Sequence, residues 1–299
     1  MQSFSRGWSF LKQAWSMAFK DKDLLKPSVY ALIVGMIVSV IGLIPIIIVA
    51  IIMGDTQLGN IIMFVLGAIL MFVQFVITYV FSGMTVHLIY GYLTKGDGKM
   101  SEAWDIVRRD FFDILTLAAI STVVGLLRQA AQNNRNRGVA GNLARAATGV
   151  LQVLWTEAAA LILPAMIIDN LNLKDSAIRI GNIVKENLLL IGITTVGVGW
   201  VTGFISIIVG GITLVIAIAI GAGLSFASGG STAITVVGIV TGALIFFTVV
   251  MLLSIFSSYT KTAYHTCLYI WTRDVEKATE EGRVASQVQA PAPLAAVLA

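Results

Sequence analysis

Three long stretches without a charged residue constrain this chain more than any other feature. Residues 27–54, 56–94 and 187–260 contain no Asp, Glu, Lys or Arg. About 20 apolar residues in a helix cross the roughly 30 Å of hydrocarbon in a bilayer, so each stretch can span a membrane, and the last must hold at least two crossings. Backbone amides in lipid must bond within helices. The sequence therefore predicts a multi-pass helical membrane protein.

Composition supports this interpretation and excludes other classes. Hydrophobic residues make up 57% of the 299 positions and charged residues 12%, and the mean hydropathy is +0.89, too apolar for a soluble globule. Cys267 is the only cysteine, which rules out an internal disulfide and argues against a Cys-rich metal site. Soluble-enzyme motifs are absent, and Gly96-Asp97-Gly98-Lys99 lacks the spacing of a phosphate-binding loop. We expect no catalytic activity and no cofactor.

We expect an all-α membrane helix bundle of six hydrophobic segments. Residues 1–26 form an amphipathic interfacial helix, 27–273 the transmembrane domain, and 274–299 a cytoplasmic tail that is disordered from about 284, where Ala and Pro replace any helical stripe. The first apolar run is too long for a cleaved signal and should remain as a span. The segments lie at about 28–53, 60–93, 111–128, 146–168, 187–222 and 232–270.

Two amphipathic stripes precede apolar segments. In both, apolar residues recur at steps of three or four, which predicts helices lying on the bilayer surface. The first stripe is Phe4, Trp8, Leu11, Trp15 and Phe19, and the second is Met100, Trp104, Val107 and Phe111. We expect Trp8, Trp15 and Trp104 to be interfacial anchors. A weaker third copy suggests three pseudo-repeats, each a surface helix followed by a helical hairpin. Alternatively, any surface helix before a span would show this pattern.

The distribution of Lys and Arg predicts the orientation. Five basic residues precede the first span, four lie in 95–109, and Arg273, Lys277 and Arg283 follow the last span. Both termini should therefore be cytoplasmic in a prokaryotic cell membrane, with anionic lipid head groups as partners rather than nucleic acid. Four arginines in 128–145 depart from this pattern, because they would lie on the extracellular side of the membrane if 114–168 crossed it twice. Either the rule is violated there and the chain crosses six times, or 114–168 is a re-entrant or interfacial hairpin.

The third long stretch raises a length problem. A helix over 187–222 would be about 54 Å long, more than the hydrocarbon thickness. We expect a break or kink at Gly210-Gly211, and an extracellular turn at 228–231.

Glu157 is the most unusual residue, because it lies in an otherwise apolar segment. A carboxylate near the bilayer centre costs at least about 2.5 kcal/mol and usually faces a partner or a water-filled cavity. We expect a polar site for protons or cations here, with Arg128 as the counter-ion. If the segment is only interfacial, Glu157 is an ordinary solvated or paired residue.

Glycines form two spaced pairs in the last two segments, Gly199 with Gly203 and Gly238 with Gly242. Small residues at this spacing let helices approach closely in lipid. The pairs predict either packing within one hairpin or a face for self-association.

His87 and His265 each lie eight residues before a basic residue that ends a segment, so they could share one depth. A bis-His haem or metal site follows only if their helices are adjacent. Hydrogen-bonded packing is the simpler interpretation, and we expect no metal.

Residues 3–8, 20–25, 164–170 and 175–179 carry a loose resemblance to a prokaryotic domain-of-unknown-function family of six-segment membrane proteins. The resemblance runs to about residue 273 and implies architecture and a prokaryotic membrane, with no catalytic residue.

Three functions follow as hypotheses. The first is a non-catalytic membrane scaffold or accessory subunit, a homo-oligomer or bound to another membrane protein. The second is a small-solute or ion transporter or channel using a polar site around Glu157. A membrane redox subunit, which would need His87 and His265 to converge, is third.

Overall fold

The structure is a computed structural model that describes residues 2–54, 56–133, 139–227, 232–284 and 287–298. Within these ranges the side chains of 2–4, 133, 139–140, 184–202, 225, 233 and 296–298 lie outside the description. The expected turn at 228–231 also lies outside the described residues.

The described residues form helices with short connections and contain no strand, which confirms the expected fold class. Local sequence explains several helix ends. The hydroxyl of Thr56 accepts a hydrogen bond from the Gly59 amide at the start of α3, and Gly96 ends it with a positive φ of 80°. The elements are α1 (Gln2–Lys20), a short 3₁₀ turn (Lys22–Leu25), α2 (Lys26–Met53), α3 (Gln57–Lys95), α4 (Met100–Arg109), α5 (Phe111–Asn133), α6 (Val139–Asp169), α7 (Leu173–Ala227), α8 (Thr232–Glu280) and α9 (Ala292–Leu298).

Six helices are long and apolar enough to cross a membrane, as the sequence predicts. The third and fourth spans are longer than expected, because α5 continues past Arg128 to Asn133 and α6 begins at Val139. At the helical rise, the 23 residues of α5 extend about 35 Å. Both arms of this hairpin therefore have the length needed for a full crossing.

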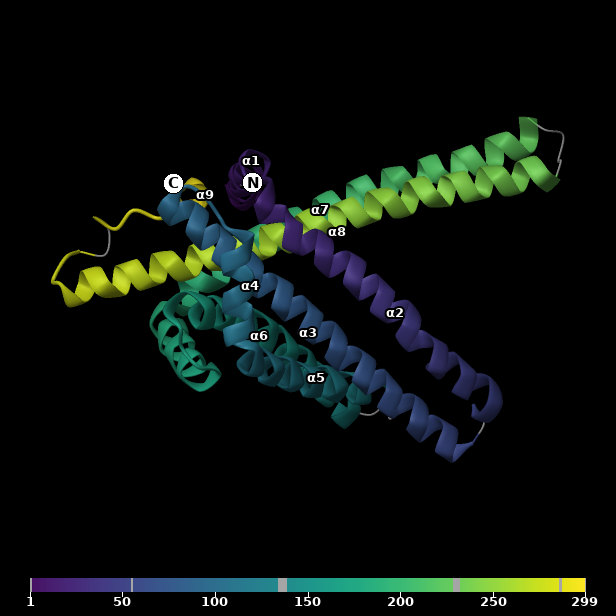
Figure 1. The fold of residues 1–299 in the computed structure, drawn as a ribbon, viewed down its shortest axis with the longest axis horizontal. Helices are drawn as coiled ribbons and strands as arrows, with labels where there is room; N and C mark the ends of the chain where they lie inside the picture. The colour runs from purple at the N-terminus through teal and green to yellow at the C-terminus, as the bar shows by residue number, and fades with distance from the viewer. Residues whose placement is uncertain (1, 55, 134–138, 228–231, 285–286, 299) are drawn as a thin grey trace.

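The long helices pair as hairpins that pack together near the chain termini and diverge farther out (Figure 1). The α2–α3 hairpin and the distal part of the α7–α8 hairpin point away from each other, and α5–α6 packs beside α3. None of the most apolar part of α2 or α3 is buried, against 33% for α5 and 44% for α6. The divergent hairpins therefore leave most of their apolar surface to the surroundings.

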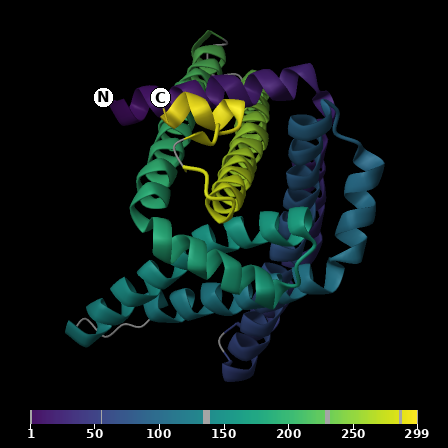
Figure 2. The same ribbon diagram turned by 90° about the vertical axis from the view of Figure 1, so that its left-hand side faces the viewer.

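The core lies where the helices converge, near the two termini. Large side chains from α1, α3, α5, α6 and α8 are completely or almost completely buried there, among them Phe10, Leu88, Leu117, Met166, Tyr259 and Tyr264. Helix α1 lies across this end with α9 beside it (Figure 2). Burial of this apolar surface is the main favourable term that holds the hairpins together.

Helix α1 differs from the expected surface helix. Leu11 and Ala14 are buried, and the indole of Trp15 donates a hydrogen bond to the Thr260 hydroxyl at 3.0 Å. Part of the apolar stripe is thus covered by α7, α8 and α9 and not by lipid, although Trp8 and Phe19 remain exposed. The stripe itself shows only that one face is apolar, and protein or lipid can cover such a face.

Two further expectations differ from the structure. Helix α7 runs without interruption through Gly210-Gly211, so the extra length is not removed by a break there. The same helix includes the third amphipathic copy, which is not a separate element. The tail expected to be disordered from 284 contains α9, whose Leu294 is fully buried against the core.

Candidate functional site

A cavity with a mainly apolar wall and several polar groups lies between α3, α5, α6 and α8, inside the region of the expected membrane spans. Its volume is about 220 Å³, enough for several waters or a small solute. Many of its lining residues carry hydroxyl, amide or charged groups: Thr78, Tyr79, Ser82, Ser121, Gln152, Thr156, Ser258, Lys261, Thr262 and His265. Phe75, Val86, Val124, Trp155, Ala160 and Leu163 complete the wall. The cavity combines an apolar wall with convergent polar groups, as ligand sites do.

Glu157 of α6 and His265 of α8 meet beside this cavity. The carboxylate oxygen Oε2 of Glu157 lies 2.9 Å from Nε2 of His265. His265 is 3% exposed, whereas the carboxylate side chain is 35% exposed. The contact joins a buried imidazole to a group that reaches open space.

Hydrogen-bond geometry fixes how many protons this pair holds. Nδ1 of His265 lies 2.8 Å from the carbonyl oxygen of Lys261, which can only accept, so Nδ1 carries a hydrogen. The contact between Nε2 and Glu157 then needs one more proton. That proton lies on the imidazole, giving a cation beside a carboxylate, or on the carboxyl group, giving two neutral partners. In both forms the pair is neutral as a whole.

An ion pair between α6 and α8 sets the register in which Glu157 and His265 meet. Asp169 at the end of α6 lies 3.2 Å from the Arg273 guanidinium on α8. Glu157 precedes Asp169 by twelve residues, and Lys261 precedes Arg273 by the same number. Both therefore lie about 18 Å along their helices from the ion pair, level with each other.

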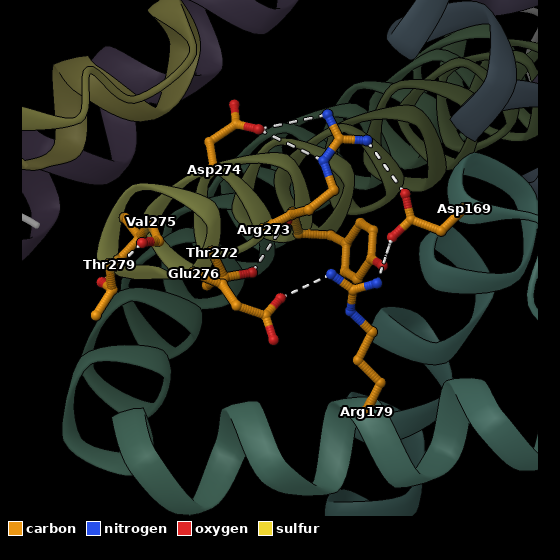
Figure 3. A network of polar contacts seen from close by, with 9 residues as sticks. Asp169, Arg179, Thr272, Arg273, Asp274, Val275, Glu276 and Thr279 are labelled. Carbon is orange, nitrogen blue, oxygen red and sulfur yellow. Dashed lines mark hydrogen bonds and ion pairs between the residues drawn. The ribbon is translucent and has the colours of Figure 1, made fainter. Parts of the chain in front are cut away.

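This register depends on a larger polar network (Figure 3). Asp169 also accepts a short hydrogen bond from the Tyr269 hydroxyl and pairs with Arg179 of α7 at 2.9 Å. Arg179 in turn contacts Glu276 at 2.7 Å. Burial lowers the pKa of Arg179, but Tyr269, Asp169 and Glu276 raise it by more, so it lies above its ordinary value. The network links the ends of α6, α7 and α8.

A second hydrogen-bond cluster forms another wall of the cavity. The Ser121 hydroxyl on α5 contacts the Tyr79 hydroxyl at 2.7 Å and accepts from the Trp155 indole at 2.8 Å. It also donates to the Leu117 carbonyl at 2.9 Å. One hydroxyl thus joins α3, α5 and α6 at the cavity wall.

The expected counter-ion of Glu157 was wrong. Arg128 makes a short hydrogen bond to Gln152, and Glu157 pairs with His265 instead. Gln152 lies five residues before Glu157 on the continuous helix α6, which places it more than one turn away on another face. Arg128 therefore reaches the cavity region through Gln152 and not through Glu157.

Lys261 and Ser121 belong to this site but were not identified from the sequence. Lys261 lines the cavity, is itself exposed, and lies close enough to Glu157 for their charges to interact without forming an ion pair. Its position was a usable signal, since it interrupts an otherwise uncharged run between residues 187 and 272. Ser121 carried no signal, because hydroxyl groups are common in apolar helices.

The two histidines do not form a joint site. His87 lies 3.7 Å from Glu102 of α4, while His265 pairs with Glu157, and no hydrogen bond joins them in the described chain. No group of three or more His, Cys, Asp or Glu that could hold a metal occurs among the described residues.

The glycines divide into packed and open positions. A Cβ at Gly238 would lie 3.1 Å from Leu224, and one at Gly242 would collide with the carbonyl oxygen of Ala217, so both pack against α7. A Cβ at Gly203 would meet nothing within 4 Å. The surroundings of Gly199 lie outside the described residues.

The expected anchor Trp104 lies half-exposed on α4, with the Arg108 guanidinium 5.1 Å from its ring centroid. This position is compatible with a membrane–water interface, where indole rings are enriched. Trp8 is likewise half-exposed, so only Trp15 of the three expected anchors is bonded into the core.

Comparison with known proteins adds no relative. No protein-family model matches the chain, and no curated protein matches it in sequence.

Proposed function

We propose that this protein is a non-catalytic membrane carrier that binds a small polar solute in the cavity between α3, α5, α6 and α8. The observation that supports this most is the set formed by Glu157, His265 and Lys261: His265 and Lys261 line the cavity, and Glu157 of the neighbouring helix contacts His265. It is the second of the three hypotheses drawn from the sequence, and it now has a site of defined geometry.

The free-energy cost of placing charged groups within a membrane span supports this proposal. A charged side chain near the middle of a span costs at least about 2.5 kcal/mol, and such residues usually face an aqueous cavity, a partner or a substrate path. Packing alone would be served as well by apolar residues that fill the space. A cavity of about 220 Å³ that combines an apolar wall with a few polar groups is instead what solute binding requires.

The orientation proposed with this function places both termini in the cytoplasm of a prokaryotic cell. The excess of Lys and Arg around the converging ends supports it, as do six spans, which return the chain to its starting side. The resemblance to a six-segment family of unknown function is in keeping with this architecture and adds no substrate.

Thiol labelling tests whether the cavity contains water. Thr262 lines the cavity, so we expect Thr262→Cys to react with a hydrophilic maleimide in proteoliposomes, because the reagent needs a solvated thiolate. Leu244→Cys, on the same helix but 63% exposed toward the surroundings, should remain unreactive in lipid. The unchanged protein, whose Cys267 is fully buried, is the background control. An unreactive Thr262→Cys would contradict the proposal.

A self-associating scaffold is the second candidate. Its support is the exposed apolar surface of the two divergent hairpins, together with the open position of Gly203. If the α7 face around Gly203 joins two copies, Gly203→Leu should lower the mass of the detergent-solubilised particle. An unchanged mass would assign this face to lipid.

A further inference from the structure

We infer that the solute of this cavity is anionic, bearing a carboxylate or phosphate group, and that Lys261 is its charge partner. This inference rests on the proposed binding function and names the ligand class for that same site. Its basis is the balance of charges around the cavity, obtained from the hydrogen bonds of the side chains that face it.

The Glu157 carboxylate, which contacts the cavity-lining His265, is already neutralised. Glu157 and His265 share one proton in their contact, so the pair contributes no net charge in either protonation form. Other carboxylates of the packed helices are engaged at a distance: Asp169 binds Tyr269, Arg179 and Arg273, and Asp113 accepts from the Leu173 amide at 3.2 Å. None of these can compensate a further cation in the cavity.

Two cations remain without a matching anion. Lys261 lines the cavity and forms no ion pair in the part of the chain that the structure describes. The Arg128 guanidinium reaches the same region through Gln152, which is a neutral acceptor. The described site therefore carries a net positive charge, which favours the binding of an anion.

The remaining lining groups suit the oxygens of an anion. Lys261 supplies up to three N–H donors, and hydroxyl groups of Ser82, Ser258 and Thr262 lie on the cavity wall. A carboxylate or phosphate can accept several hydrogen bonds at once, each shorter and stronger than one between neutral groups. A cationic solute would instead meet Lys261 as a like charge, which disfavours binding.

Such an anion can come from a free small molecule or from the head group of a membrane lipid. Both carry the same recognised chemistry, and Lys261, which lines the cavity and is exposed, is accessible to either source. The experiment therefore needs two probes.

Inorganic phosphate is the first probe, added to the full-length protein in phosphatidylcholine nanodiscs at constant ionic strength. A ligand that binds only the folded state raises the unfolding midpoint with a saturable concentration dependence. We expect phosphate, but not chloride, to do so in the unchanged protein and in Lys261→Arg. The response should be lost in Lys261→Gln. Lys95→Gln, whose side chain is 70% exposed outside the cavity, is the matched control and should respond normally.

Phosphatidylglycerol is the second probe, tested by native mass spectrometry after purification from mixed vesicles of phosphatidylglycerol and phosphatidylcholine. A lipid source predicts that the protein retains phosphatidylglycerol preferentially and that Lys261→Gln loses this preference. A free solute predicts the phosphate response alone. Either result supports the inference.

Two results would overturn it. One is that the unchanged protein shows neither a phosphate response nor phosphatidylglycerol retention, which is decisive even if a variant fails to fold. The other is that Lys261→Gln behaves like the unchanged protein toward both probes. If Thr262→Cys is nevertheless labelled, the cavity binds a solute of another charge and only the anion inference fails; without labelling, the proposed function fails as well.

Discussion

His265 and Glu157 are in contact, with Nε2 and Oε2 2.9 Å apart, although 108 residues separate them in the chain. Because the other imidazole nitrogen donates to the Lys261 carbonyl at 2.8 Å, this contact holds a single proton. The pair can thus place a polar, exchangeable group beside the cavity without adding net charge. The predictions below test this pair, the register that creates it, and the topology around it.

Removing the carboxyl group should cost more than replacing it by an amide. Glu157→Gln can still donate a hydrogen bond to Nε2 of His265, whereas Glu157→Leu leaves a buried nitrogen without a partner. We expect Glu157→Leu to lower the free energy of unfolding by about 1–3 kcal/mol, and Glu157→Gln to have a smaller effect. Thermal unfolding in detergent measures both. Equal losses in the two variants would show that the contact does not depend on hydrogen bonding.

Asp169 should be the most sensitive residue of the network at the converging ends. Its loss leaves Arg273, whose side chain is 12% exposed, with the longer contact to Asp274 at 3.4 Å, and also removes a partner of Arg179. We expect Asp169→Ala to lower the free energy of unfolding by about 3 kcal/mol. Asp105→Ala, on the exposed face of α4, is the matched control and should change it by less than about 0.5 kcal/mol. Similar values for both variants would mean that the network does not set the register.

Two glycines of the last hairpin should respond oppositely to alanine. A methyl group at Gly242 collides with the backbone of α7, so Gly242→Ala should destabilise the protein by about 1–3 kcal/mol. Gly203 has open space, and Gly203→Ala should be neutral or stabilise its helix by up to about 1 kcal/mol. Chemical denaturation of the purified protein measures the difference. A loss of stability in Gly203→Ala but not in Gly242→Ala would contradict this prediction and indicate that a partner packs on the α7 face around Gly203.

The length of α5 predicts that residues 96–99 and the far end of α5 lie on opposite sides of the membrane. A membrane-impermeant maleimide applied to intact cells should therefore label Gln132→Cys but not Asp97→Cys. Both residues are exposed, and each variant should become labelled on the other side once the cells are opened. Labelling of both from one side only would support the re-entrant hairpin instead of six crossings.

The spans followed from the sequence because lipid imposes one simple rule on composition. Uncharged runs longer than a crossing must be helical, so α2 and α3 were predicted to within a few residues. The third span is longer than the sequence predicts, because Arg128 ends the apolar run but its guanidinium bonds Gln152 within the hairpin, and α5 continues to Asn133. A charged residue ends an apolar run in the sequence but not necessarily a helix.

The candidate site was only half predictable for a related reason. Glu157 stood out, because a carboxylate in an apolar helix is costly wherever it lies. Its partner could not be chosen, since the parallel register of α6 and α8 depends on Asp169 and Arg273 meeting at the helix ends. Periodicity likewise identified the apolar face of α1 but could not show that Leu11 packs on protein and not lipid.

The most direct test of the account is an electron cryo-microscopy map of the protein in lipid nanodiscs, at a resolution that shows ordered solvent. We expect density for water or a bound anion between Lys261, Gln152 and His265, with the Glu157 carboxyl group on Nε2 of His265. Acyl-chain density that fills this space, with Lys261 turned outward to the bilayer surface, would contradict a solute-binding cavity.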